Sequence, residues 1–112
     1  MYNHHIIDLT FDNKGPLIKM DEFRKMLLEC CNGCGVIVLH DYFYSFGQTN
    51  GFTGVICLSE SHISIHTWPE NFKMCVDVFM CNNERSDTFM KLLNDKIIVK
   101  CIKHDIRTIE RM

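Results

Sequence analysis

The chain has 112 residues, of which 46% are apolar and 23% charged, with a net charge of -2 and a pI near 6.3. This length predicts a single domain over residues 1–112, and the lack of a basic excess argues against nucleic acid or an anionic membrane as partner. No apolar run approaches the roughly 20 residues that cross a bilayer, and the first residues lack the features of a signal peptide. We therefore expect a cytoplasmic protein.

Seven cysteines are many for this length: Cys30, Cys31, Cys34, Cys57, Cys75, Cys81 and Cys101. Their number is odd and no secretion signal precedes them, so we interpret them as reduced thiols. Cys31 and Cys34 form an isolated Cys-x-x-Cys pair, which is a weak signal for a redox pair or half a zinc site. Because the pair lies at the end of a predicted helix, and not at its start, we interpret it as helix packing.

The first predicted element is a strand over residues 4–11, rich in β-branched and aromatic side chains and followed by a turn cluster at residues 12–16. A helix is predicted over residues 21–31, capped by Asp21 and ended by two glycines, Gly33 and Gly35. Its apolar side chains repeat at helical spacing and predict one buried face: Phe23, Met26, Leu27 and Cys30.

Residues 35–43 and 52–58 predict two strands separated by a polar loop at residues 45–51. Gly54 lies inside the second strand, where glycine often marks a bulge or a close backbone approach. A further strand is predicted over residues 62–68, because its side chains alternate between two faces.

Residues 74–81 predict another strand, and residues 82–86 predict a turn. A short second helix follows, marked by three apolar side chains: Phe89, Leu92 and Leu93. We expect Ser86 or Asp87 to cap this helix. Residues 97–102 are expected to form the closing strand, and the polar tail at residues 105–112 can add a short edge strand.

The element order is therefore β-α-β-β-β-β-α-β. Two helices cannot cover both faces of a sheet of about six strands. The predicted fold class is α/β, a two-layer α/β sandwich with a mostly antiparallel sheet and two helices on one face. The partly open opposite face would suit a dimer contact.

The Glu60-Ser61 step lies in the segment with the most reactive side chains in the chain. A serine hydroxyl is a weak nucleophile unless a base or local strain activates it. It can then attack the carbonyl of the preceding peptide bond to give an ester. Elimination from the ester leaves dehydroalanine, which hydrolyses to a pyruvoyl group.

The run Leu-Ser-Glu-Ser-His-Ile-Ser-Ile-His-Thr-Trp-Pro-Glu at residues 58–70 resembles the self-cleavage segment of the prokaryotic S-adenosylmethionine decarboxylases. Residues 5–9, 51–55 and 76–81 are similar to other segments of that family. The resemblance implies cleavage into residues 1–60 (β chain) and 61–112 (α chain), with the pyruvoyl cofactor derived from Ser61.

This resemblance implies an enzyme that decarboxylates S-adenosylmethionine through a Schiff base and supplies aminopropyl groups for spermidine synthesis. A homodimer of cleaved protomers is expected. It also implies roles for particular residues. His66 matches the family histidine required for processing, Thr53 a hydroxyl residue that assists it, and Cys81 the proton donor in decarboxylation. Trp68 and Glu70 match positions near the bound nucleoside.

Phe46 matches an aromatic that stacks on adenine, although its loop is one residue longer than the family pattern. Asn82, Met80 and Ser59 replace residues usual in the family near the presumed site. These changes keep two alternatives open: a pyruvoyl-dependent arginine or ornithine decarboxylase of the same fold, and a non-catalytic regulatory relative.

Two simpler interpretations of the segment at residues 58–70 are a solvated strand and a metal site. A strand rich in serine and histidine is commonly a half-solvated sheet face. His62 and His66 could bind zinc, but no third ligand is evident and we expect no metal.

Ser61 and His66 are five positions apart. On a straight strand their side chains would lie on opposite faces, about 16 Å apart at ~3.3 Å per residue. We therefore predict a sharp break in the chain at Glu60-Ser61, or a contribution from a neighbouring segment or subunit.

Overall fold

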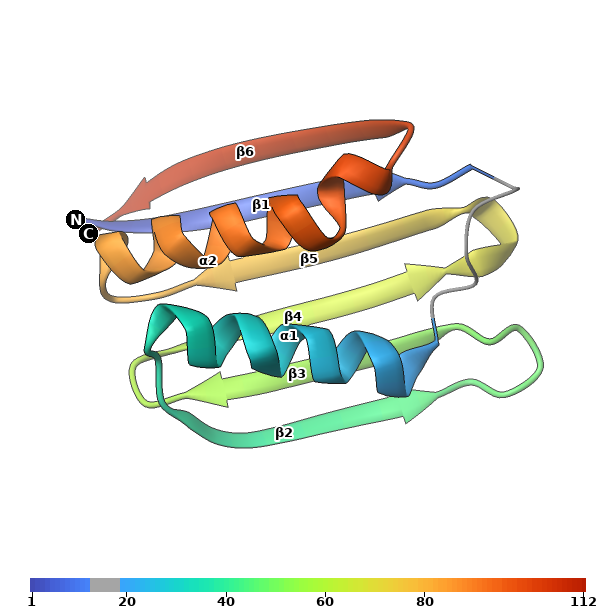
Figure 1. The fold of residues 1–112 in the computed structure, drawn as a ribbon, viewed down its shortest axis with the longest axis horizontal. Coiled ribbons are helices and arrows are strands. Elements are labelled where there is room, and N and C mark those ends of the chain that lie inside the picture. Colours follow the sequence, from blue (N-terminus) through green and yellow to red (C-terminus); the bar gives the residue numbers. More distant parts are fainter. Residues whose placement is uncertain (13–18) are drawn as a thin grey trace.

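The computed structural model describes residues 1–12 and 19–112. They form one antiparallel sheet, in the order β2-β3-β4-β5-β1-β6, with both helices on the same face (Figure 1). The elements are β1 (Tyr2–Thr10), α1 (Met20–Cys34), β2 (Val38–Ser45), β3 (Phe52–Leu58), β4 (Ser61–Trp68), η1 (Pro69–Asn71), β5 (Lys73–Phe79), α2 (Asn83–Lys96), η2 (Ile98–Lys100) and β6 (Lys103–Arg111). The predicted two-layer sandwich is confirmed. Beyond Asp12, the turn predicted at residues 12–16 lies outside the described residues.

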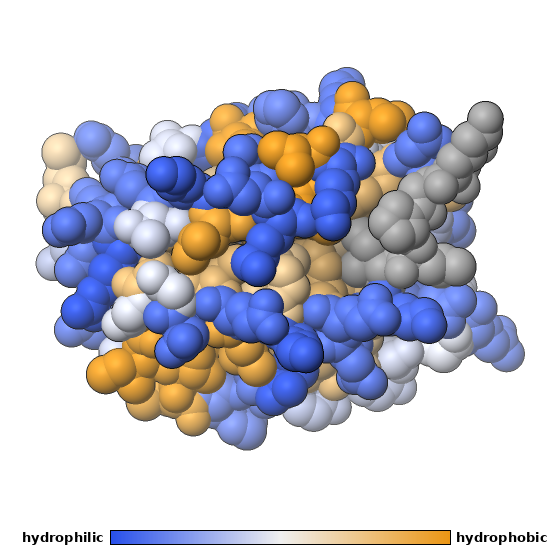
Figure 2. Space-filling view, in the orientation of Figure 1, coloured by the Kyte–Doolittle hydropathy of each residue, from blue (hydrophilic) through white to orange (hydrophobic). Residues whose placement is uncertain are grey.

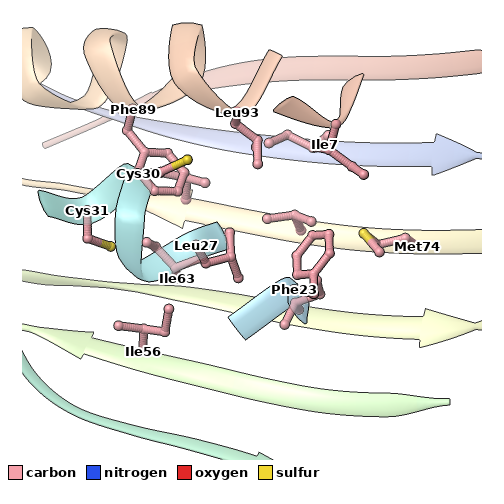
Figure 3. Close-up of a cluster of buried hydrophobic side chains, with 14 of the residues drawn as sticks. Ile7, Phe23, Leu27, Cys30, Cys31, Ile56, Ile63, Met74, Phe89 and Leu93 are labelled. Carbon is pink, nitrogen blue, oxygen red and sulfur yellow. The ribbon is translucent and has the colours of Figure 1, made fainter. Parts of the chain in front are cut away.

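The hydrophobic core lies between the sheet and the two helices. Alternation along each strand sends every second side chain into it, so that Ile63 and Ile65 of β4 are each 1% exposed. Figure 3 shows Leu27 of α1 and Phe89 and Leu93 of α2 directed at this face of the sheet. Each such side chain contributes about 1.5–3 kcal/mol by leaving water, so this layer holds the strands in register.

Helix α1 is longer at both ends than predicted. It starts after Lys19, which makes no side-chain capping bond, so the prediction of Asp21 as cap was wrong. Gly33 does not end the helix. Leu92 of α2 packs so closely against it that an added Cβ would lie 2.8 Å from the leucine side chain. Gly35 takes the left-handed conformation (φ 80°) and closes the helix, as glycine does at this position.

Helix α2 starts earlier than predicted. Its N-cap is Asn82, whose side chain accepts a hydrogen bond of 3.0 Å from the Arg85 backbone N–H. The predicted turn at residues 82–86 and the predicted caps Ser86 and Asp87 were therefore wrong. Ser86 lies within the first turns, fully buried, and its hydroxyl is bonded to the ring of His5.

The strand predicted over residues 97–102 is absent, because Ile97 and Ile98 are buried beneath the end of α2 and the chain forms η2 there. The polar tail forms β6 instead, a nine-residue edge strand that pairs along the whole length of β1 (Figure 1). Charged side chains suit an edge strand, because they discourage pairing with other chains.

The remaining strands match their predictions more closely. β3 has the predicted bounds, while β2 begins three residues late because Gly35 and Val36 complete the end of α1. At Gly54 neither a bulge nor a neighbouring backbone explains the glycine, because it is the Phe43 side-chain ring that fills the space where a Cβ would lie. β5 ends at Phe79, so Cys81 lies just beyond the strand.

The face of the sheet opposite the helices is uncovered by any element in the described part of the chain. Several large apolar side chains of this open face are solvent-exposed: Tyr42, Tyr44, Val55, Trp68 and Ile109. The helical face is largely hydrophilic, apart from patches such as the one near the start of β2, where Ile37 and Leu39 are exposed (Figure 2). No helix among the described residues is long and apolar enough to cross a membrane.

Candidate active site

The Glu60-Ser61 peptide lies at a tight reversal of the chain. Strands β3 and β4 form a hairpin in which Leu58 pairs with Ser61, and Ser59 and Glu60 form the turn. The predicted break at Glu60-Ser61 is thus confirmed as a chain reversal. It precedes Ser61, however, and β4 continues from Ser61 through His66. The reversal therefore does not bring Ser61 toward His66.

Cys81 forms hydrogen bonds with both residues of this peptide. Its thiol donates a hydrogen bond of 2.7 Å to the main-chain carbonyl of Glu60, and its backbone N–H donates one of 3.1 Å to the Ser61 hydroxyl. The first bond draws electron density from the carbonyl, and the second fixes the hydroxyl beside it. Both effects favour attack of a serine oxygen on the preceding carbonyl carbon.

A small cavity of about 20 Å³ adjoins this peptide. This volume is close to that needed for a single water molecule and is far too small for an amino acid. It is lined by Val36, Leu58, Ser59, Glu60, Ser61, Met80, Cys81, Asn82 and Arg85.

His66 and Thr53 form a second pair of reactive groups on the open face. They are partners across β3 and β4, and His66 Nδ1 lies 2.6 Å from the Thr53 hydroxyl. When that hydroxyl donates to the Ile65 carbonyl, 3.4 Å away, Nδ1 must be the protonated nitrogen and Nε2 is left as an acceptor. Five positions of strand separate His66 from Ser61, a distance of about 16 Å. The structure thus joins Glu60, Ser61 and Cys81 but leaves His66 and Thr53 apart from them.

The three predicted nucleoside-binding residues lie at the His66 end of the sheet. Trp68 ends β4 and its ring centroid is 6.3 Å from that of His66, while Glu70 follows in η1. Phe46 is 56% exposed in the loop between β2 and β3, and Gly51 of this loop packs against η1.

A cavity of about 500 Å³ lies at this end of the sheet. This size is typical of a pocket for a small molecule. It is lined by Asp8, Leu9, Thr10, Trp68, Asn71, Lys73, Met74, Cys75, Lys103 and Asp105. Of the three predicted nucleoside-binding residues, Trp68 alone belongs to this lining.

The cysteines near the end of α1 behave as packing groups. Cys30, Cys31 and Cys34 are buried and free. Burial, with a smaller contribution from the two neighbouring thiols, raises the pKa of Cys31 to about 12. A thiol with so high a pKa is a poor nucleophile and a poor metal ligand at neutral pH, which agrees with the packing interpretation.

Sequence reasoning missed two features near these sites. Arg85 lines the small cavity beside Glu60 and Ser61, and its position four residues after Cys81, in the first turn of a helix, was the available signal. On the open face, Asp77 accepts a hydrogen bond of 3.2 Å from Ser64 and lies 3.5 Å from the His4 ring. The alternation of β5 could have placed Asp77 on that face, but not these contacts.

The hairpin turn thus places a serine hydroxyl beside a carbonyl that accepts a hydrogen bond, the two groups that an acyl shift within the chain would require. Comparison with known proteins agrees. The family model described as S-adenosylmethionine decarboxylase matches residues 3–112. The chain is 36% identical over 115 positions to the S-adenosylmethionine decarboxylase proenzyme of Methanococcus vannielii, covering 97% of this chain and 93% of that protein. It is 33% identical to the proenzyme of the same name from Aquifex aeolicus, covering 87% and 75%.

The crystal structure of the adenosylmethionine decarboxylase from Aquifex aeolicus has the same fold, with a TM-score of 0.83 and 28% identity over 98% of this chain and 89% of that one. The chain therefore belongs to the S-adenosylmethionine decarboxylase family. Proenzymes of this family are pyruvoyl-dependent, and their pyruvoyl group forms from a serine on self-cleavage. The family, the enzyme class and the cofactor predicted from the sequence are confirmed.

Proposed function

We propose that this chain is a proenzyme that cleaves itself between Glu60 and Ser61, and that the product decarboxylates S-adenosylmethionine to the aminopropyl donor of spermidine synthesis. The observation that carries the proposal is the double contact of Cys81 with the Glu60 carbonyl and the Ser61 hydroxyl. Residues 1–60 and 61–112 become two chains of one folded domain. Their strands β3 and β4 stay paired after the cut, because the sheet and core hold both.

The cleavage is an acyl shift followed by an elimination. The Ser61 oxygen attacks the Glu60 carbonyl carbon, the C–N bond breaks, and an ester joins the two residues. A base removes the Ser61 α-proton, the bond from Cβ to oxygen breaks, and Glu60 leaves as a carboxylate. Tautomerisation and addition of water to the resulting dehydroalanine release ammonia and leave the pyruvoyl group at residue 61.

Cys81 then serves the decarboxylation. The pyruvoyl group supplies an electron sink for the electrons left when carbon dioxide departs. The thiol of Cys81 already lies within hydrogen-bond distance of the peptide that gives rise to this group. It is therefore placed to return a proton to the substrate carbon as a general acid.

A second copy of the chain completes the site. His66 is about 16 Å along β4 from Ser61, so a histidine that helps to process Ser61 has to come from another copy. The open face offers the surface for a homodimer, because its apolar side chains are exposed and both helices lie on the other side. In a twofold dimer, His66 and Thr53 of each copy face the Ser61 end of the other.

The same pairing supplies the substrate site. Trp68, Glu70 and Phe46 lie at the His66 end, so they approach Ser61 only across the dimer. Aromatic rings of Trp68 and Phe46 suit an adenine ring, and the Glu70 carboxylate suits hydroxyl or amino groups of a nucleoside. Such an enzyme of polyamine synthesis works in the cytoplasm.

The test is the intact mass of the purified protein under denaturing conditions. Two fragments divided after Glu60, the second blocked by pyruvoyl, are expected. Ser61→Ala is the matched control and should remain one chain without activity. Carbon dioxide released from carboxyl-labelled S-adenosylmethionine, but not from labelled arginine or ornithine, identifies the substrate. A cleaved or active Ser61→Ala protein would overturn the proposal.

A further inference from the structure

The carboxylate that self-cleavage creates needs a counter-charge. The scissile Glu60 carbonyl is neutral before cleavage and becomes a full negative charge when the ester breaks. That charge appears on a residue that already carries a side-chain carboxylate, and two like charges so close disfavour each other. A cation at this place would favour departure of Glu60.

We propose that Arg85 is this cation, and that it stabilises the Glu60 carboxylate as it leaves during self-cleavage; the inference rests on the proposed function. Arg85 lines the cavity of about 20 Å³ together with Glu60, Ser61 and Cys81. Among the described residues of that lining it is the one cation. A guanidinium presents paired donors that match the two oxygens of a carboxylate.

Arg85 is available for this role. No carboxylate of the described residues lies within 4.0 Å of its guanidinium, whereas Arg24 is already bonded at 2.7 and 2.9 Å to Asp41. The backbone of Arg85 is fixed by its N–H bond to Asn82 at the start of α2. Asn82 follows Cys81 directly, so one short segment positions both the Cys81 thiol that donates to the Glu60 carbonyl and the Arg85 guanidinium.

A structural role is the competing explanation. The Arg85 Nε lies 4.0 Å from the position of a Cβ on Gly35, which closes α1. A cation near the carbonyl end of a helix stabilises that helix. Loss of this interaction would lower stability, but it would not stop cleavage at the ester stage. The two roles therefore differ in which chemical species accumulates.

The experiment follows wild type, Arg85→Gln, Arg85→Lys and Lys91→Gln by intact mass after synthesis in a cell-free system. Lys91→Gln removes an exposed cation from the same helix, away from both cavities. Neutral hydroxylamine divides the ester, giving a fragment that begins with serine at residue 61 in place of pyruvoyl. We expect Arg85→Gln to slow cleavage about 10²-fold, the lower end of the range for loss of one charge-stabilising group, and to accumulate the hydroxylamine-sensitive ester.

Arg85→Lys should retain most of the cleavage rate, and Lys91→Gln should match wild type. Arg85→Met, which keeps the apolar stem, replaces Arg85→Gln if the latter folds poorly by circular dichroism. Wild-type cleavage rates in Arg85→Gln and Arg85→Met, or slow cleavage without trappable ester, would overturn the proposed role of Arg85 and leave the proposed function standing. Failure of the wild type to cleave would instead overturn the proposed function.

Discussion

The thiol of Cys81 donates a hydrogen bond of 2.7 Å to the carbonyl of Glu60, a residue 21 positions away in the sequence. The backbone N–H of the same cysteine donates to Ser61. One residue thus contacts both groups that react in the proposed self-cleavage. The structure places Cys81 there because β5 runs beside β4 in the sheet and ends at Phe79, two residues before Cys81. Cys81 can therefore act in two stages, first on the carbonyl and later on the substrate.

Cys81→Ala and Cys81→Ser should separate these two stages. Cys81→Ala loses the side-chain donor to the Glu60 carbonyl, and removal of one such donor typically costs about 10²–10³-fold in rate. Cys81→Ser keeps a hydroxyl donor and should cleave more nearly at the wild-type rate. Both should lose most decarboxylase activity, because alanine has no proton to donate and a hydroxyl is a far weaker acid than a thiol. The measurements are intact mass against time and release of labelled carbon dioxide.

Cys101→Ala is a suitable control, because its thiol bonds only to the Ile97 carbonyl and lies beyond the opposite end of α2 from Cys81. It should leave cleavage unchanged. Equal cleavage rates in Cys81→Ala and wild type would show that the thiol contact plays no part in processing.

Mixing two inactive variants tests whether His66 acts on a second copy. A His66→Ala chain keeps an intact Ser61, and a Ser61→Ala chain keeps an intact His66. Co-expressed, the mixed dimer should cleave the His66→Ala chain, because the other copy supplies the histidine. The Ser61→Ala chain should stay whole. The two chains can be told apart by their masses.

Each variant alone should remain uncleaved, which sets the baseline for the mixture. A mixture as inert as its components would argue that His66 acts within its own chain. Replacement of Thr53 by alanine in the Ser61→Ala chain should weaken the rescue, since Thr53 holds Nδ1 of the His66 ring at 2.6 Å.

Local patterns predicted the sheet well, because β-branched runs and two-residue alternation are properties of short segments. The strand expected at residues 97–102 failed for the opposite reason. Ile97 and Ile98 are buried against the helical layer, and only the complete fold reveals that environment. The motif named Glu60 and Ser61, and the odd spacing to His66 already indicated that they do not meet within one strand. The contacts of Cys81 and the position of Arg85 depend on where β5 ends and α2 begins, which no local pattern specified.

The buried thiol of Cys31 should resist alkylation in the native protein. Its pKa is raised to about 12, so at pH 8 about one molecule in ten thousand carries the reactive thiolate. Iodoacetamide followed by peptide mass mapping should therefore show Cys31 unmodified in the native chain and modified in urea. The raised pKa also makes the free energy of unfolding depend on pH. The stabilisation from the neutral Cys31 thiol is complete below the unfolded pKa of about 8.5 and is lost as pH rises toward the folded pKa.

Cys31→Ala should accordingly make the loss of unfolding free energy above pH 9 less steep than in the parent chain. Both chains need the Ser61→Ala change, which keeps a single uncleaved species for two-state analysis. Rapid native alkylation of Cys31, or an identical alkaline slope in the two chains, would contradict the burial seen here.

The bonds of His5 predict a further loss of stability in acid. His5 is 6% exposed, and its ring nitrogens lie 2.9 Å from the Thr108 hydroxyl and 3.0 Å from that of Ser86. Burial lowers its pKa, and His4 lowers it further, against an opposing effect of Asp87. The folded state therefore favours the neutral ring. The unfolded chain binds a proton near pH 6.5, so stability falls as pH drops below that value.

Urea unfolding of the Ser61→Ala chain at pH 7.5 and pH 5, at one fixed protein concentration, measures this effect. His5→Gln should be less stable at pH 7.5 but should show a smaller difference between the two pH values. Ser86→Ala leaves one ring nitrogen without its buried partner and should cost about 1–3 kcal/mol. Thr88→Ala is its control on the same helix, because that exposed hydroxyl bonds only to the Glu84 carbonyl, and it should change stability by less than about 0.5 kcal/mol. If His5→Gln keeps the full acid dependence, other groups cause it and the buried ring does not.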